Sequence, residues 1–407
     1  MTRALVGGTV YTAPAAEPLD GAVLIRRGEI AAIGAQLDIP NDARIVDCRG
    51  CAITAGFWNS HVHFHERKWA DVATTSASEL EAQLQEITRY GFTSVFDLSS
   101  QWENTRRLRD RIESGEVRGP RIYSTGEGLL PLRGTPSAEV FRVLGLMQTK
   151  LFEVGTSLEA RSAAKRLLEQ GADGVKLFIS SPSAGQLAPE IIAAAVEEAH
   201  AAGKPVFAHP NTATDIHAAL EGGVDIIAHT TPRSGAWDEE LLNRMKACSA
   251  ALIPTLMVWQ SMMRHDRIST REQLVETAVA QLRAWLEVGG TVLFGTDLGA
   301  VEYDPSDEYA LMARAGATFD QVLASLTTTP ARRFGAPFET RPFETRAARA
   351  PQGDTGGEIA VGMPADLVVL EGDPLQDVET LASVRYTLRA GEIIYASKER
   401  LRAKVKP

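Results

Sequence analysis

Three of the eight histidines in the chain lie in the stretch AGFWNSHVHFHE, residues 55–66, at His61, His63 and His65. In a β-strand, side chains at alternate positions point to the same face, so these imidazoles would lie side by side. Imidazole nitrogens are good ligands for Zn²⁺ and related cations. A His-x-His pair is common, however, so a metal site here requires further ligands from other parts of the chain.

Later apolar runs also carry side chains that can bind a metal ion. Lys176 lies inside the run GVKLFIS, and His209 follows the run PVFA. His229 follows VDIIA, and Asp297 follows VLFGT. Alone, each has an ordinary explanation: a buried histidine, a lysine whose ammonium reaches solvent, or an aspartate in a turn. Because all of them accompany apolar runs in chain order, one shared site is the better explanation.

The elements that would position these side chains alternate regularly between strand and helix. Helical segments between the apolar runs carry start and stop signals, such as the Ser76-x-x-Glu79 capping box and Gly91 after the segment that it opens. Eight candidate strands are found at residues 53–60, 93–98, 121–125, 174–179, 205–208, 225–228, 251–254 and 291–295. This pattern predicts an α/β protein with a (β/α)8 TIM barrel, whose chemistry lies at the C-terminal ends of the strands. A doubly wound open sheet is the alternative, but no G-x-G-x-x-G opens a helix.

Both ends of the chain have the pattern of a β-protein. GAVLIRRGEIAAIG near the start and VRYTLRAGEIIYA near the end are apolar runs separated by turn residues. We therefore predict a small β-sandwich domain formed by residues 1–52 and 358–407, with the barrel at 53–336. The remaining segment, 337–357, repeats Pro-Phe-Glu-Thr-Arg at 337–341 and 342–346 and is interpreted as an exposed or disordered loop insertion.

Composition excludes several classes of partner and location. The net charge of −10 lacks the basic footprint of a nucleic-acid-binding protein. No run of about 18 apolar residues predicts a membrane span, and the first residues lack the pattern of a signal peptide. The three cysteines, Cys48, Cys51 and Cys248, are too few for a disulfide framework. These features predict a cytoplasmic protein without a nucleic-acid or membrane partner.

Three motifs resemble the amidohydrolase superfamily, in its imidazolonepropionase-like branch of metal-dependent hydrolases. GFWNSHVHFHE is similar to the first-strand signature of that superfamily and GTDLG to the last, while VGMPADLVVLEGDPL resembles the return to the β-domain. The resemblance covers nearly the whole chain. It implies a binuclear metal centre with two divalent ions, and the imidazole-rich ligand set favours zinc. The ligands implied are His61, His63 and Asp297 for one metal, His209 and His229 for the other, and Lys176, as a carbamate, for both.

The same resemblance implies a hydrolase acting on an amide, cyclic amide or small peptide C–N bond rather than on long peptides. A metal-bridging hydroxide would attack the carbonyl carbon, and Asp297 would act as general base and then as general acid. Small dipeptides, including prolyl ones, and N-acyl amino acids are the substrates that the resemblance favours. An esterase or lactonase using the same site is the alternative. A non-catalytic scaffold is less favoured, because the sequence keeps every ligand, and a deaminase is less favoured because Lys176 suits a two-metal site.

Candidate substrate-binding residues are His65, Arg133 and Trp259. Arg133 lies in GEGLLPLRGTP and Trp259 in PTLMVWQSMMRHD, the segments after the third and seventh candidate strands. They would give a small-molecule substrate an apolar pocket with one basic anchor. The alternatives are that His65 is simply buried, that Arg133 is a solvated surface residue, and that Trp259 packs a helix against the barrel. The family is compatible with a homo-oligomer.

Overall fold

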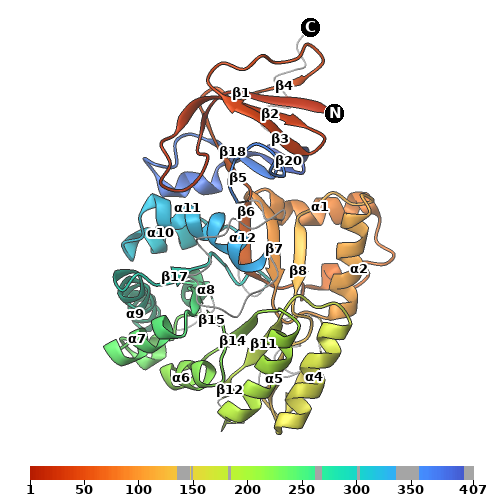
Figure 1. Ribbon diagram of the computed structural model, residues 1–407. Helices are drawn as coiled ribbons and strands as arrows, with labels where there is room; N and C mark the ends of the chain where they lie inside the picture. Colours follow the sequence, from red (N-terminus) through yellow and green to blue (C-terminus); the bar gives the residue numbers. More distant parts are fainter. Residues whose placement is uncertain are drawn as a thin grey trace.

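The computed structural model describes residues 1–134, 147, 150–181, 185–261, 268–299, 303–335 and 357–397. It has a sheet built from both ends of the chain, at the top of Figure 1, and below it a larger part in which helices surround parallel strands. The α/β class with parallel sheets predicted from the sequence is confirmed. The tandem repeat at 337–346 and the residues Met262, Met263 and His265 lie outside the described residues.

The sheet at the top of Figure 1, called the terminal sheet below, joins strands from the two ends of the chain. Its strands are β1 (Thr2–Val10), β2 (Leu19–Arg26), β3 (Glu29–Gly34), β4 (Arg44–Asp47), β5 (Cys51–Ala55), β18 (Leu367–Glu371), β19 (Val384–Arg389) and β20 (Glu392–Ala396). They follow the order β20-β19-β18-β5-β1-β2-β3, and β4 pairs with β1. Strand β18 pairs antiparallel with β5, with Val369 opposite Ile53. The two ends of the chain thus form one sheet. That this sheet folds into a β-sandwich remains a prediction.

The parallel strands carry all eight runs identified in the sequence, in the same order. They are β6 (Phe57–Val62), β7 (Phe92–Asp97), β8 (Arg121–Ser124), β11 (Val175–Phe178), β14 (Val206–His209), β15 (Ile226–Ala228), β16 (Ala251–Ile253) and β17 (Thr291–Val292). Strands β9 (Leu129–Pro131) and β10 (Phe152–Val154) extend the second of the two parallel sheets. Within the described residues, β12 (Ser180–Ser181) and β13 (Gly185–Gln186) form a separate two-stranded sheet. The first candidate strand is in fact two, because the chain passes from β5 into β6 at Gly56. A Cβ atom at Gly56 would lie 2.2 Å from Oγ1 of Thr93, so only glycine fits there.

Backbone hydrogen bonds connect the two parallel sheets. The amide of Ser60 on β6 donates to Phe294 at 2.7 Å, and the amide of Asp297 donates to His61 at 2.9 Å. On the other side, the amide of Asp173, just before β11, donates to the carbonyl of Ser124 at 2.7 Å. The first and last strands therefore lie next to each other, and their C-terminal ends meet.

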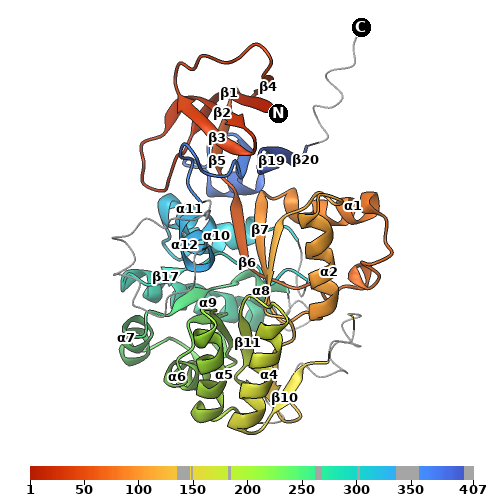
Figure 2. The same cartoon turned by 45° about the vertical axis from the view of Figure 1, so that its right-hand side comes forward.

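Helices cover the outside of the parallel strands, as Figure 2 shows for α1, α2, α4 and α5. The helices are α1 (Ala77–Thr88), α2 (Trp102–Glu113), α4 (Ser157–Glu169), α5 (Pro189–Ala201), α6 (Ala213–Glu221), α7 (Glu239–Ala247), α8 (Met257–Ser261), α9 (Ile268–Glu287), α10 (Ser306–Arg314), α11 (Phe319–Leu326) and α12 (Thr328–Phe334). Helix α1 begins at the predicted cap, where the Ser76 side chain accepts from the Glu79 amide. It buries Leu80 and Leu84 one turn apart.

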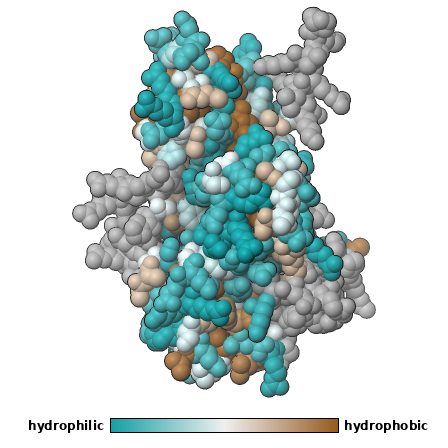
Figure 3. Space-filling view, turned by 90° about the vertical axis from the view of Figure 1, so that its right-hand side faces the viewer, coloured by the Kyte–Doolittle hydropathy of each residue, from teal (hydrophilic) through white to brown (hydrophobic). Residues whose placement is uncertain are grey.

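Polar side chains dominate the outer faces of these helices. On the face seen in Figure 3, hydrophilic residues cover most of the described surface. On α2, for example, the partly exposed Arg106 forms ion pairs with Glu103 at 3.0 Å and Asp110 at 2.9 Å. None of the helices in the described ranges has the length and apolar character needed to cross a bilayer.

Candidate metal centre

Three candidate ligands meet where β6 ends beside the segment that follows β17. Nε2 of His63 lies 2.8 Å from Oδ1 of Asp297, and Nε2 of His61 lies 3.0 Å from the same oxygen. The two Nε2 atoms are 3.2 Å apart. All three side chains are buried. Two imidazole nitrogens and a carboxylate oxygen that converge on one point are a ligand set for a divalent cation.

The close approach of these segments depends on Asn59 and Gly295. The Asn59 amide group donates to Oγ1 of Thr296 at 2.8 Å, and its oxygen accepts from the backbone amides of Thr296 and His61, both at 3.2 Å. A Cβ atom at Gly295 would lie 2.9 Å from Cβ of His61 and 2.4 Å from a methyl group of Ile253. Glycine therefore permits the approach, and Asn59 fixes it.

Two further histidines extend this group. The ring centroid of His229, after β15, lies 4.7 Å from that of His61 and 4.6 Å from that of His209, at the end of β14. Nδ1 of His229 is 2.6 Å from Oγ1 of Thr255. His229, Thr255 and Asp297 all have a positive φ, at 86°, 44° and 62°. Non-glycine residues are strained there by about 1–3 kcal/mol each, and such strain concentrates at functional sites.

Lys176 completes the group from β11. Its side chain is 1% exposed, and within the described part of the chain its Nζ atom has no hydrogen-bond partner. Burial lowers the pKa of Lys176 to about 7, although Asp297 opposes this shift. Burial is the main cause of the lowered pKa values of His61, His209 and His229, and the charge of Lys176 contributes to each of them. Its Nζ lies 5.7 Å from the centroid of the Phe178 ring, but a buried amine without a hydrogen-bond partner among the described residues is unusual and fits a group that is modified or bound when the site is complete.

The protonation states of the group are those that metal ligands require. Burial lowers the pKa of His61 to about 3 and that of His209 to about 4, with Lys176 contributing to both shifts. Burial alone would raise the pKa of Asp297, but His61 and His63 hold it well below its usual range. At neutral pH His61 and His209 are therefore neutral imidazoles and Asp297 is an ionised carboxylate, so these residues fit a metal centre.

Known proteins resemble this chain in sequence and in fold. The sequence model described as the amidohydrolase family matches residues 52–338, which is more than half of the chain. The chain belongs to the amidohydrolase family. The resemblance inferred from the sequence motifs is thereby confirmed. Among curated proteins, this amidohydrolase is 24% identical to an ochratoxinase of Aspergillus niger over 409 residues, covering 89% of this chain and 80% of the relative.

Two solved structures share the fold of this amidohydrolase. A Xaa-Pro dipeptidase with bound methionine superimposes with a TM-score of 0.79 at 21% identity, covering 98% of this chain and 100% of the dipeptidase. A prolidase complexed with N-methylphosphonate-L-proline has a TM-score of 0.75 at 26% identity, with the same coverage. The family and these relatives support a hydrolase.

The candidate substrate residues of the amidohydrolase lie in three different settings. His65 is buried and stacks on His63, with ring centroids 4.9 Å apart. Trp259 on α8 is partly exposed, and its indole N–H donates to Oγ1 of Thr230 at 3.0 Å, next to His229. Arg133 is exposed in the turn after β9, and no hydrogen bond or ion pair links it to the candidate ligands in the described ranges. The structure thus brings His65 and Trp259 to the site but leaves Arg133 outside the ligand group.

Sequence analysis missed Asp97, which ends β7 beside the histidine stretch. This buried carboxylate accepts from the hydroxyl groups of Ser100, of Ser124 at 2.7 Å and of Thr105 at 3.2 Å. It also accepts from the amide of Phe64 at 3.4 Å, the residue between His63 and His65. Burial raises the pKa of Asp97, and the bonds from Ser100 and Ser124 oppose that rise. The signal that pointed to it was an aspartate at the end of an apolar run, as for Asp297.

Asp97→Asn is expected to destabilise the amidohydrolase by about 1–3 kcal/mol, because the amide keeps one acceptor oxygen for several buried donors. The measurement is the free energy of unfolding from denaturant titration. Asp110→Asn on the exposed face of α2 is the matched control and should change it by less than about 0.5 kcal/mol. Equal stabilities for the two variants would contradict a supporting role for Asp97.

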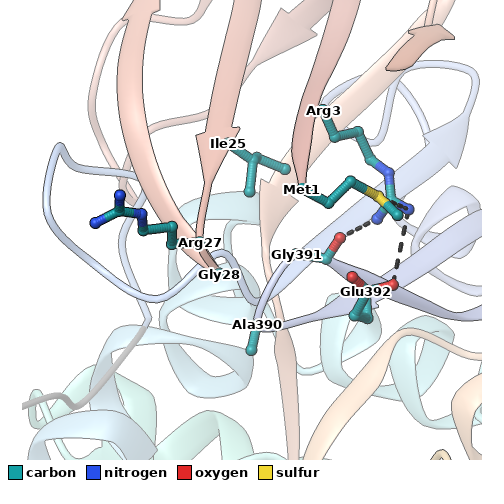
Figure 4. A pocket seen from close by; sticks show the side chains of 8 residues that line it. All are labelled: Met1, Arg3, Ile25, Arg27, Gly28, Ala390, Gly391 and Glu392. Atoms are coloured by element: carbon teal, nitrogen blue, oxygen red, sulfur yellow. Dashed lines mark hydrogen bonds and ion pairs between the residues drawn. The ribbon is translucent and has the colours of Figure 1, made fainter. Parts of the chain in front are cut away.

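The cavity in Figure 4 is unrelated to this chemistry. It lies in the terminal sheet, where β1, β2 and the turn between β19 and β20 meet. The Arg3 guanidinium there donates to the carbonyl of Gly391 and lies 3.9 Å from the carboxylate of Glu392. Arg3 is thus held by neighbours in the same sheet, and none of the candidate ligands lines the cavity.

Proposed function

We propose that this amidohydrolase is a metal-dependent enzyme that cleaves an amide, cyclic amide or small peptide C–N bond. One observation supports the proposal: candidate ligands on five strands, or directly after them, are linked by short polar contacts, ring contacts and charge interactions. They are His61, His63, Lys176, His209, His229 and Asp297. Four imidazoles, a carboxylate and an amine are more ligands than one tetrahedral ion needs.

The six residues would hold two ions. His61, His63 and Asp297 would hold one, while His209 and His229 would hold the second. Lys176 would reach both as a carbamate, which has two oxygen ligands where the amine has one nitrogen. The imidazole-rich set favours zinc. When bound, paired divalent cations lower the pKa of a water molecule and polarise the carbonyl group of the substrate.

The side chains supply the proton chemistry. The Asp297 carboxylate, ionised at neutral pH, accepts a proton from the attacking water and returns it to the leaving nitrogen. An amine is a poor leaving group until it is protonated, so an amidase depends on this step more than an esterase does. For Lys176, the neutral amine attacks carbon dioxide, forms an N–C bond and releases a proton, which leaves the carbamate anion. Its pKa near 7 makes the neutral amine available at physiological pH.

Removal of metal tests the proposal directly. The purified protein is expected to contain about two equivalents of metal by elemental analysis, and chelation should abolish hydrolysis until zinc or manganese is returned. The substrate panel should contain dipeptides, N-acyl amino acids and lactones, with Xaa-Pro dipeptides included because of the solved relatives. A protein without stoichiometric metal would instead be a non-catalytic scaffold. Faster turnover of lactones than of every amide would favour the esterase alternative.

We also propose that residues 53–336 close into a (β/α)8 barrel. The hydrogen bonds from β6 to the segment after β17, and from Asp173 to Ser124, support this closure. Residues 1–52 and 358–407 would form the β-sandwich beside it. A cytoplasmic location is supported by the free state of Cys48, Cys51 and Cys248.

A further inference from the structure

The segments that follow β15 and β16 meet at His229. Nδ1 of His229 lies 2.6 Å from Oγ1 of Thr255, and both side chains are buried. The backbone amide of His229 also donates to the carbonyl of Ile253 at 2.8 Å. The backbone and the ring of His229 are thus both fixed to β16 and to the turn that follows it.

We propose that Thr255 is a positioning residue that selects the tautomer of His229, and that Glu308 in turn holds Thr255 in place. The inference rests on the metal centre of the proposed function. It assigns roles to two residues that lie outside the group of candidate ligands.

The tautomer matters because a neutral imidazole carries one proton on either of its two nitrogens. When Nδ1 donates this proton to Oγ1 of Thr255, Nε2 keeps the lone pair that a metal ion requires. The opposite tautomer would place a hydrogen on Nε2 and block the ligand atom. A hydrogen-bond acceptor at Nδ1 is the usual way in which proteins fix the ring and the tautomer of a ligating histidine.

Thr255 reaches this position with an unfavourable backbone. Its φ of 44° lies in the left-handed region, which β-branched residues rarely adopt. The next two amides are both bound by one carboxylate: Leu256 donates to Oε1 of Glu308 at 2.9 Å, and Met257 donates to Oε2 at 2.8 Å. These bonds hold the turn in the strained conformation and start α8 directly after it.

Glu308 is a carboxyl group in a fully buried position, which is unusual. It lies on α10 with no exposed surface, and burial raises its pKa to about 7. Each of its oxygens takes one of the two amides, so the geometry uses both. A glutamine has one such oxygen, and its NH₂ group would face the second amide. The two oxygens of the carboxylate therefore satisfy the two amides that follow Thr255, and Glu308 has no contact with solvent.

The test compares Thr255→Val with Thr255→Ser. Valine keeps the β-branched shape and the backbone strain but removes the acceptor, whereas serine keeps the hydroxyl. Zinc affinity, measured by competition with a chromophoric chelator, is expected to fall about 10–100-fold in Thr255→Val and to stay within about 3-fold of wild type in Thr255→Ser. In the metal-free protein labelled with ¹⁵N-histidine, NMR should show the Nδ1–H tautomer for His229 in wild type and its loss in Thr255→Val.

Controls separate this inference from the metal centre itself. Thr277→Val removes an exposed hydroxyl on α9 and should leave both measurements unchanged. Glu308→Gln should lower zinc affinity, as Thr255→Val does. If Glu308→Gln does not fold, the comparison of Thr255→Val with Thr255→Ser tests the positioning role. If wild type binds zinc and Thr255→Val has the same zinc affinity and the same His229 tautomer, the positioning role is overturned and the proposed function is not. Failure of wild type to bind zinc would overturn the proposed function.

Discussion

Asp297→Asn is expected to lower kcat/KM for an amide substrate by at least about 100-fold, the low end of what a general acid–base residue contributes. The amide side chain keeps the size of the carboxylate, but it cannot accept the proton of the attacking water or return it to the leaving nitrogen. Steady-state kinetics with an amide and an ester of the same acyl group is the measurement. The amide should lose more activity than the ester, because only the amine must be protonated to leave.

Metal content must be measured on the same Asp297→Asn preparation, since Asp297 is also a candidate ligand. The effect on the proton transfer is read from enzyme that has been reloaded to the wild-type metal content. Asp20→Asn, an exposed position in the terminal sheet, is the matched control and should keep full activity. Wild-type turnover by fully loaded Asp297→Asn would contradict the assigned role.

Lys176→Ala is expected to reduce the metal content from about two equivalents to about one and to lower activity by at least about 100-fold. The carbamate would be the only ligand shared by both ions, so its loss weakens the second site most. Elemental analysis and kinetics are the measurements. Formate or acetate should restore part of the activity by placing a carboxylate in the vacated space, and Lys165→Ala on exposed α4 should have no effect.

The low pKa of Lys176 adds a dependence on pH. Because burial lowers this pKa to about 7, the neutral amine, which is the form that would react with carbon dioxide, predominates above pH 7 and disappears as the pH falls below it. Reconstitution of the metal-free enzyme with zinc should therefore need bicarbonate and should slow below pH 7. Two equivalents of metal in Lys176→Ala would show that the lysine does not bridge.

The sequence was enough to predict the strands and to name candidate ligands because both signals are local. Each strand is a short apolar run, and Lys176, His209, His229 and Asp297 lie within or directly after such a run. The order of the runs was enough to predict that their ends meet. Local sequence, by contrast, could not predict that the first candidate strand is divided into β5 and β6, because that division depends on the contact of Gly56 with Thr93 on another strand.

The supporting residues were missed because their partners are distant in the chain. Glu308 binds amides about fifty positions away, and Asp97 binds the amide of Phe64 from another strand. No spacing rule connects such pairs. Arg133 is a different case. It was a candidate because it is a basic residue in a loop after a strand, but neither feature predicts the direction in which its side chain points. For Trp259 both interpretations have support. It is a residue of α8 that packs against the hydrophobic core, and its indole N–H donates to Thr230 beside the candidate site.

The order of the terminal sheet has a consequence for synthesis in the cell. Strand β5 pairs with β1 on one side and with β18 on the other, and β18 begins at Leu367. While the ribosome is still making the helices, β5 therefore has an open edge that only the last part of the chain can fill. Unpaired edges of this kind invite association with other chains. We therefore expect chaperones to bind nascent chains that stall before β18 more than chains that have completed it, because only the former leave this edge of β5 unpaired.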